Sequence, residues 1–160
     1  MATDELWTDR DDAELALAAL PEGHPVRIVE SFVTMLLGDS LQLEALAGFV
    51  TPEARDDWSD FSGARGYFMD QALASSTVAL RHRGAADVAY VKLVPNVGPL
   101  VVARPRTDHV GFATLVWRRE LGGWRVHAIG EPIPPALLPR TSRNDAPEYA
   151  GDRFVQVERD

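Results

Sequence analysis

Cysteine is absent from the 160-residue chain, and its absence excludes disulfides, thiolate catalysis and cysteine-ligated zinc or iron–sulfur centres. Lysine is almost absent, because Lys92 is the only lysine among 16 basic residues. Acidic residues number 24 and give the chain a net charge of −8. A surface of this sign repels phosphate backbones and anionic lipids, so we expect neither nucleic acid nor a membrane surface as a partner.

Long apolar runs and chemical signature motifs are also missing. No run approaches the roughly 20 residues of a membrane-spanning helix, and the chain does not begin with a basic segment followed by an apolar core. We therefore expect a soluble, cytoplasmic protein. There is no glycine-rich phosphate loop, His-Glu-x-x-His motif, nucleophile elbow or calcium loop. The histidines at 24, 82, 109 and 127 lack ligand spacing, so the sequence predicts no metal site and no cofactor.

The residues that are present suit one folded domain, because 46% of them are hydrophobic and a chain of this length can bury a real core. The first half carries helical signals. The strongest helix is predicted at 24–38, where Pro25 suits the first turn, Gly38 suits the end and the apolar residues between them recur at helical spacing. Further helical segments are predicted at 11–20, 39–50, 51–58 and 60–76.

From residue 77 the apolar pattern changes to the alternation of β-strands. Strands are predicted at 77–83, 87–94, 110–121 and 124–133, with a short edge strand at 100–103. Gly122-Gly123 is a strong hairpin signal between the last two long strands. The sequence thus predicts an α+β fold in which helices cover one face of an antiparallel sheet.

The predicted domain organisation has three parts. A helical extension covers 1–23, a single α+β domain covers 24–138 and a polar tail covers 139–160. The end of the tail, "RFVQV", has a strand-like pattern. Either the tail is loose, or these residues add an edge strand in this chain or in a partner subunit.

Three features carry a resemblance to a known superfamily. They are the amphipathic helix at 25–37, the helix start "TPEARDDW" and the closing hairpin "LVWRRELGGWRVHAIGEP". In these features the chain resembles the nuclear-transport-factor-2-like superfamily, which includes ketosteroid isomerase and polyketide cyclase relatives. The resemblance implies a strongly curved antiparallel sheet that forms a cone-shaped, cystatin-like cup with an apolar pocket. It also implies a homodimer through the opposite sheet face.

Alternation places His82 on the same strand face as Val78 and Leu80, which is the expected core or pocket side. Histidine titrates near neutral pH, so His82 is a candidate general acid or base. The alternative interpretation is a strand-end histidine that bonds only to a neighbour or meets solvent.

Residues 57–70 form an acidic and aromatic stretch in the least regular helical region. A carboxylate in apolar surroundings can move protons at neutral pH, and Asp70 is the candidate here. Tyr90, or alternatively Tyr67, is the candidate hydroxyl. Helix caps, solvated acids and aromatic packing are the competing interpretation. The predicted pocket lining consists of Trp58, Phe61, Tyr67, Phe112, Trp117 and Trp124.

His127 shares strand parity with Arg125 and Ile129, whereas Trp124 and Val126 form the more apolar face. We therefore expect Trp124 to face the core and His127 to lie on the outer or dimer face in a structural role. A β-bulge in this strand would exchange these assignments.

Three functions agree with these observations. The first is binding of a small, largely apolar ligand, or an accessory role without turnover. The second is a cofactor-independent isomerase, dehydratase or cyclase that uses His82 or Asp70 together with Tyr90 or Tyr67. The third is a protein-interaction module that uses the exposed sheet face and the tail.

Overall fold

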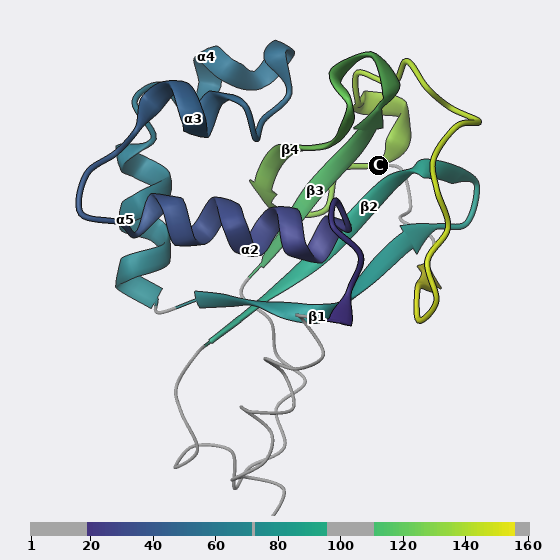
Figure 1. Ribbon diagram of the computed structural model, residues 1–160, viewed down its shortest axis with the longest axis horizontal. Coiled ribbons are helices and arrows are strands. Elements are labelled where there is room, and N and C mark those ends of the chain that lie inside the picture. The colour runs from purple at the N-terminus through teal and green to yellow at the C-terminus, as the bar shows by residue number, and fades with distance from the viewer. Residues whose placement is uncertain (1–18, 72, 96–110, 156–160) are drawn as a thin grey trace, which may run out of the picture.

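Helices gather on one face of a five-stranded sheet whose strands lie in the order β4-β3-β2-β1-β5 (Figure 1). The computed structural model describes residues 19–71, 73–95 and 111–155. The helices are α2 (Pro25–Leu36), α3 (Leu43–Ala47), η1 (Pro52–Ala54), α4 (Arg55–Trp58), α5 (Ser62–Gln71), η3 (Arg119–Leu121) and η4 (Pro135–Leu137). The strands are β1 (Leu73–His82), β2 (Ala85–Pro95), β3 (Gly111–Arg118), β4 (Gly123–Gly130) and β5 (Arg153–Val155).

The α+β class is confirmed, but the sheet differs from the predicted antiparallel, strongly curved one. Strands β1 to β4 pair antiparallel, and β5 pairs parallel with β1. The chain leaves β4 at Gly130 and returns through a long connection, so it enters β5 in the direction of β1 instead of reversing as in a hairpin. The resulting mixed sheet is not strongly curled or closed (Figure 1).

Helix α2 is the centre of the core, and the prediction of a helix within 24–38 is confirmed. Its N-terminus is capped by His24, whose Nδ1 accepts a hydrogen bond from the Val26 amide at 3.1 Å. Pro25 occupies the first turn, where the missing N–H costs nothing. The buried face of α2 carries Pro25, Val26, Val29, Phe32, Val33 and Leu36 and packs against β1, β2 and β4.

The two faces of the sheet carry separate apolar clusters. On the α2 face, the core includes Ala79, Val91, Leu115 and Trp124. The second cluster comprises Ala85, Val88, Tyr90, Val116 and Leu138, with Leu80, Phe112 and Ile133 packed against it. Since Ile133 and Leu138 follow β4 in the chain, the protein itself covers part of the face predicted to form a dimer.

Strand β4 contains a bulge. Thr114 lies opposite Ala128 and Leu115 lies opposite Val126, which leaves His127 as the extra residue in β4. Val126 and Ile129 consequently both pack with the α2-side core although they are three residues apart. The hairpin before β4 is confirmed, with Gly122 in the left-handed conformation at φ 84° after the 3-10 turn η3.

The described part of the tail is anchored within the same chain. Asp152 forms an ion pair with the buried Arg81 at 2.7 Å, and the Tyr149 ring lies 4.5 Å from the His24 ring. We call His24, Arg81, Tyr149 and Asp152 the tail lock. Of the two predicted alternatives, the tail thus adds its edge strand β5 to its own chain (Figure 1, yellow).

Several sequence predictions concern residues outside the described ranges. They are the edge strand at 100–103 and nearly all of the helix at 11–20. Within the described residues, no helix has the length and apolar character needed to cross a membrane.

Candidate ligand-binding pocket

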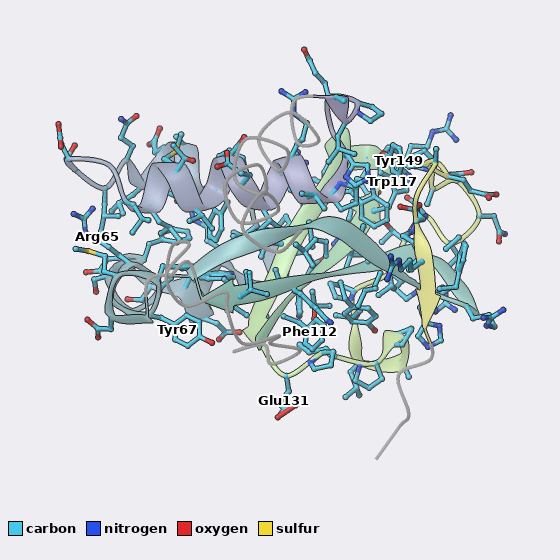
Figure 2. All side chains as sticks on the ribbon, turned by 90° about the horizontal axis from the view of Figure 1, so that it is seen from below. Arg65, Tyr67, Phe112, Trp117, Glu131 and Tyr149 are labelled. Atoms are coloured by element: carbon cyan, nitrogen blue, oxygen red, sulfur yellow. The ribbon has the colours of Figure 1, made fainter. Side chains whose placement is uncertain are left out.

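A pocket of about 470 Å³ lies between α4, α5 and the end of β4. Its walls come from Asp57, Trp58, Gly63, Ala64, Tyr67, His127, Ala128, Ile129, Gly130 and Ile133. Tyr67 marks the α5 side of the molecule, opposite the end where Trp117 and Tyr149 lie (Figure 2). The mixture of apolar walls with a few polar groups is typical of small-molecule sites.

A strained turn between α4 and α5 positions Trp58. Ser59 and Phe61 adopt positive φ values of 56° and 64°, which cost non-glycine residues free energy. Phe61 is buried, and its ring stacks on Trp58 at 5.8 Å, while Phe32 meets the edge of Trp58 at 5.4 Å. The aromatic packing offsets the strain and holds the indole at the pocket wall.

The bulge in β4 and a short parallel bridge bring His127 to the pocket. Val50 pairs with Val126, and the Thr51 amide donates to the Val126 carbonyl at 3.0 Å. This pairing places the fully buried Thr51 beside the half-buried His127, with 2.7 Å between Thr51 Oγ1 and His127 Nδ1. The histidine is thus held by one ring nitrogen, and the other nitrogen makes no hydrogen bond among the described residues.

Electrostatics around His127 favour its neutral form. Burial lowers the pKa of His127 below its ordinary value, and the nearby Glu53 and Asp57 carboxylates offset only part of this effect. The Glu53 carboxylate is already paired with Arg118, which donates hydrogen bonds to both of its oxygens at 2.8 and 3.1 Å. These hydrogen bonds lower the pKa of Glu53. Asp57 forms no ion pair within the described part of the chain, so it is the unpaired carboxylate at the pocket edge.

Tyr67 closes the pocket from the α5 side against the start of β3. A Cβ on Gly111 would lie 3.1 Å from the Tyr67 hydroxyl and 3.3 Å from the Gly130 carbonyl oxygen. Glycine at 111 therefore allows the tyrosine to approach the strand. Within the described residues, the Tyr67 hydroxyl makes no hydrogen bond, and the buried Trp58 Nε1 has no hydrogen-bond partner.

The three predicted catalytic residues do not meet at this pocket. Tyr90 is buried in the second cluster, where its hydroxyl donates to the Ile133 carbonyl at 2.7 Å and burial raises its pKa to about 12. His82 lies at the end of β1 and accepts from the Gly84 amide at 3.0 Å. Asp70 is exposed on α5 and does not line the pocket.

The predicted face of β1 was reversed for a physical reason. Ala79 and Arg81 are buried on the α2 side, whereas Leu80 packs with the second cluster. The alternation from Ala79 to Arg81 is regular, but alternation alone does not determine which of the two faces the helices cover, and Arg81 is buried on the helix side by its ion pair with Asp152. His82 shares parity with Leu80, away from the α2-side core.

The six aromatic residues predicted to line a pocket are divided among three places. Trp58 and Tyr67 line it, whereas Phe61 and Trp124 are buried in the α2-side core. Trp117 packs against that core with its ring 5.6 Å from Trp124. Phe112 packs with the second cluster on the opposite sheet face.

Sequence reasoning missed His127, Ile129 and Ile133 as pocket residues. The expectation that His127 lies on the outer face is wrong because the bulge exchanges the faces of β4. Glycine at 130, with φ 139°, marks the irregular end of the strand, but nothing local in the sequence identified the bulged residue.

No group of three or more potential metal-ligating side chains occurs in the part of the chain that the structure describes. Comparisons with protein-family models, curated proteins and solved structures find no match for this chain. The functional conclusion therefore rests on the geometry of the pocket.

Proposed function

We propose that this protein binds a small, largely apolar molecule in the pocket between α4, α5 and β4. The observation that carries the proposal is the pocket itself, which has a volume of about 470 Å³ and combines the walls of Trp58, Tyr67 and Ile129 with the single imidazole of His127. Such a volume suits a molecule of one to three rings. The protein acts as a ligand carrier or as an accessory protein without turnover.

The proposed fold family is the nuclear-transport-factor-2-like superfamily, in a variant whose cup is more open than the predicted cone. Three observations support it. Helix α2 lies across the sheet at the position expected for the long helix, and η1 begins at Pro52 within "TPEARDDW". The closing hairpin of β3 and β4 is present, and the end of its β4 strand forms one wall of the pocket.

A matched pair of glycine substitutions tests the binding site. Both Gly63 and Gly66 lie in α5, and an added Cβ would meet nothing within 4 Å at either position. Only Gly63 lines the pocket. We expect Gly63→Phe to abolish binding of fragments found by ligand-observed NMR, whereas Gly66→Phe retains it.

Two outcomes would contradict the proposal. One is a fragment screen that finds no ligand for the wild-type chain. The other is a set of bound fragments that Gly63→Phe and Gly66→Phe affect equally. Thermal melting of both variants checks that the fold survives, and both should melt near the wild-type temperature because the Cβ of the new side chain meets nothing within 4 Å at either position.

A second candidate function is a cofactor-independent isomerase, dehydratase or cyclase. The observation that favours it is that Asp57, Tyr67 and His127 border one pocket, which gives an acid, a hydroxyl and an imidazole for proton transfer. His127 replaces His82 in this proposal. Once a substrate is known, His127→Gln should abolish turnover, whereas His82→Gln should leave it unchanged; the reverse result would eliminate the proposal.

A homodimer through the second sheet face also remains a proposal. Ile133 and Leu138 cover part of that face, so a dimer would use the strands beyond them. Sedimentation velocity of the full chain tests this directly, since a single monomeric species across micromolar to millimolar concentrations would exclude it.

A further inference from the structure

The hydrogen-bonding capacity of the Thr51 hydroxyl determines the tautomer of His127. Thr51 is 0% exposed, and its Oγ1 lies 2.7 Å from His127 Nδ1. That hydroxyl has no other hydrogen-bond partner among the described residues. A buried donor left without an acceptor costs more than an unused lone pair. The Thr51 O–H therefore donates to Nδ1, and Nδ1 is the unprotonated ring nitrogen.

A neutral imidazole carries one proton, so His127 carries it on Nε2. The nitrogen that is tied to Thr51 is an acceptor, and the nitrogen left for a ligand is a donor. His127 thus offers the pocket an N–H group and not a basic lone pair. Thr51 acts as a positioning residue that fixes this choice.

The Tyr67 hydroxyl is a second polar group at the pocket. It makes no hydrogen bond to any described residue, so its proton is available to a ligand, although a hydroxyl can also accept. The indole Nε1 of Trp58 also has no partner in the described part of the structure, but it is shielded from solvent in the packing of Phe32 and Phe61, so a ligand in the pocket does not reach it.

The charge at the pocket narrows the class of ligand further. Asp57 contributes a carboxylate to the wall with no ion-pair partner among the described residues, and the whole chain has a net charge of −8. A carboxylate or phosphate ligand would meet this negative field. A cation would be attracted to Asp57, but an ammonium group has no acceptor for the His127 Nε2–H.

Building on the proposed binding function, we infer that the ligand is an uncharged molecule with an oxygen acceptor, such as a carbonyl group, on a flat apolar body. The acceptor receives the His127 Nε2–H or the Tyr67 O–H. The flat body lies among Trp58, Tyr67 and Ile129.

Four probes of one size test the ligand class. They are naphthalene, 2-acetylnaphthalene, 2-naphthoate and 2-naphthylmethylammonium, with affinities measured by NMR titration at neutral pH. We expect 2-acetylnaphthalene to bind tightest, about tenfold tighter than naphthalene for one hydrogen bond worth roughly 1.4 kcal/mol. Tightest binding of the naphthoate or the ammonium would overturn the inference while leaving the proposed function intact. If none of the four binds, the inference fails, and the fragment screen described above decides the proposed function separately.

The tautomer of His127 is measured without any ligand. Long-range ¹H–¹⁵N NMR of the wild-type chain should show an unprotonated Nδ1 and a protonated Nε2, and the opposite assignment would overturn the inference. Thr51→Val removes the hydroxyl and should give a mixture of tautomers, whereas Thr51→Ser should keep the wild-type one. Thr51→Val should also weaken 2-acetylnaphthalene about twofold for an even mixture of tautomers, because only the Nε2–H form can donate, and it should leave naphthalene unchanged.

Discussion

The tail lock and the pocket use the same kinds of side chain for opposite purposes. Each contains a half-buried or buried histidine, an aspartate and aromatic rings. In the tail lock, Arg81 pairs with Asp152 and lies 5.0 Å over the ring of Trp124. At the pocket, Asp57 has no ion-pair partner within the described residues. The type of residue therefore does not distinguish the tail lock from the proposed binding site, whereas the ion pairing of its aspartate does.

The largest loss of stability is expected when the tail lock is broken. The Arg81 and Asp152 side chains are 1% and 4% exposed. Arg81→Met leaves the Asp152 carboxylate buried without its partner, which typically costs about 3–5 kcal/mol of unfolding free energy. Chemical denaturation followed by tryptophan fluorescence measures the loss.

The control for the tail lock is the exposed ion pair of Arg119 and Asp145, whose side chains are 77% and 46% exposed. Arg119→Met should cost less than about 1 kcal/mol. The double variant Arg81→Met with Asp152→Leu should recover part of the loss, because no buried charge remains. Equal costs for Arg81→Met and Arg119→Met would show that the tail lock is not a structural element.

A smaller effect is expected from crowding the pocket at Gly111. The methyl group of Gly111→Ala would lie 3.1 Å from the Tyr67 hydroxyl, and such overpacking costs about 1–3 kcal/mol. Fragment binding should weaken with it because Tyr67 must move. Gly84→Ala is the matched control, since its nearest contact is an ordinary 3.7 Å to the His82 ring. Unchanged binding in Gly111→Ala would mean that the position of Tyr67 does not matter.

Acidification is expected to lower the stability of the fold, because each of the two regions contains a buried or half-buried histidine. Burial lowers the folded-state pKa of His24 and of His127. The unfolded chain, with histidines near about 6.5, then binds protons more readily, so stability falls as the pH drops from about 7.5 to 5.5. Glu53 and Glu120 do not contribute in this range because their pKa values are lowered, that of Glu120 to about 2.

Two substitutions separate the contributions of the regions to this pH dependence. His24→Asn keeps an acceptor for the cap of α2 but cannot titrate, and His127→Gln removes the titrating group at the pocket. Each should flatten the dependence of the unfolding free energy on pH, and the double variant should be flattest. A double variant with the wild-type slope would exclude both histidines as its source.

The smallest effect is expected at the strained turn beside the pocket. Ser59 is exposed and has φ 56° and ψ −120°, a conformation that glycine adopts without steric cost. Ser59→Gly should stabilise the fold by about 0.5 kcal/mol, because relief of strain exceeds the entropy lost by glycine. The control is Ser40→Gly at an exposed serine that does not have a positive φ, and thermal melting compares the two variants with the wild-type chain. A lower melting temperature for Ser59→Gly would show that the turn is not strained.

Part of the site was predictable from local sequence. Trp58 and Tyr67 were placed at a pocket because they follow a Thr-Pro helix start and lie in an irregular helical stretch rich in aromatic and acidic residues. His82 was misplaced because alternation gives the two faces of a strand but not which face the helices cover. Tyr90 was misplaced because an aromatic residue in a strand can pack on either side of the sheet.

The sequence by itself determined the α+β class, the helix α2 and the hairpin that joins β3 and β4, because caps, prolines, glycines and apolar spacing act over a few residues. Only the tertiary structure decided that the tail closes on Arg81 and that a bulge turns His127 toward the pocket. Both depend on pairing between segments far apart in the chain. Local propensity carries no information about which distant strand or residue becomes the partner.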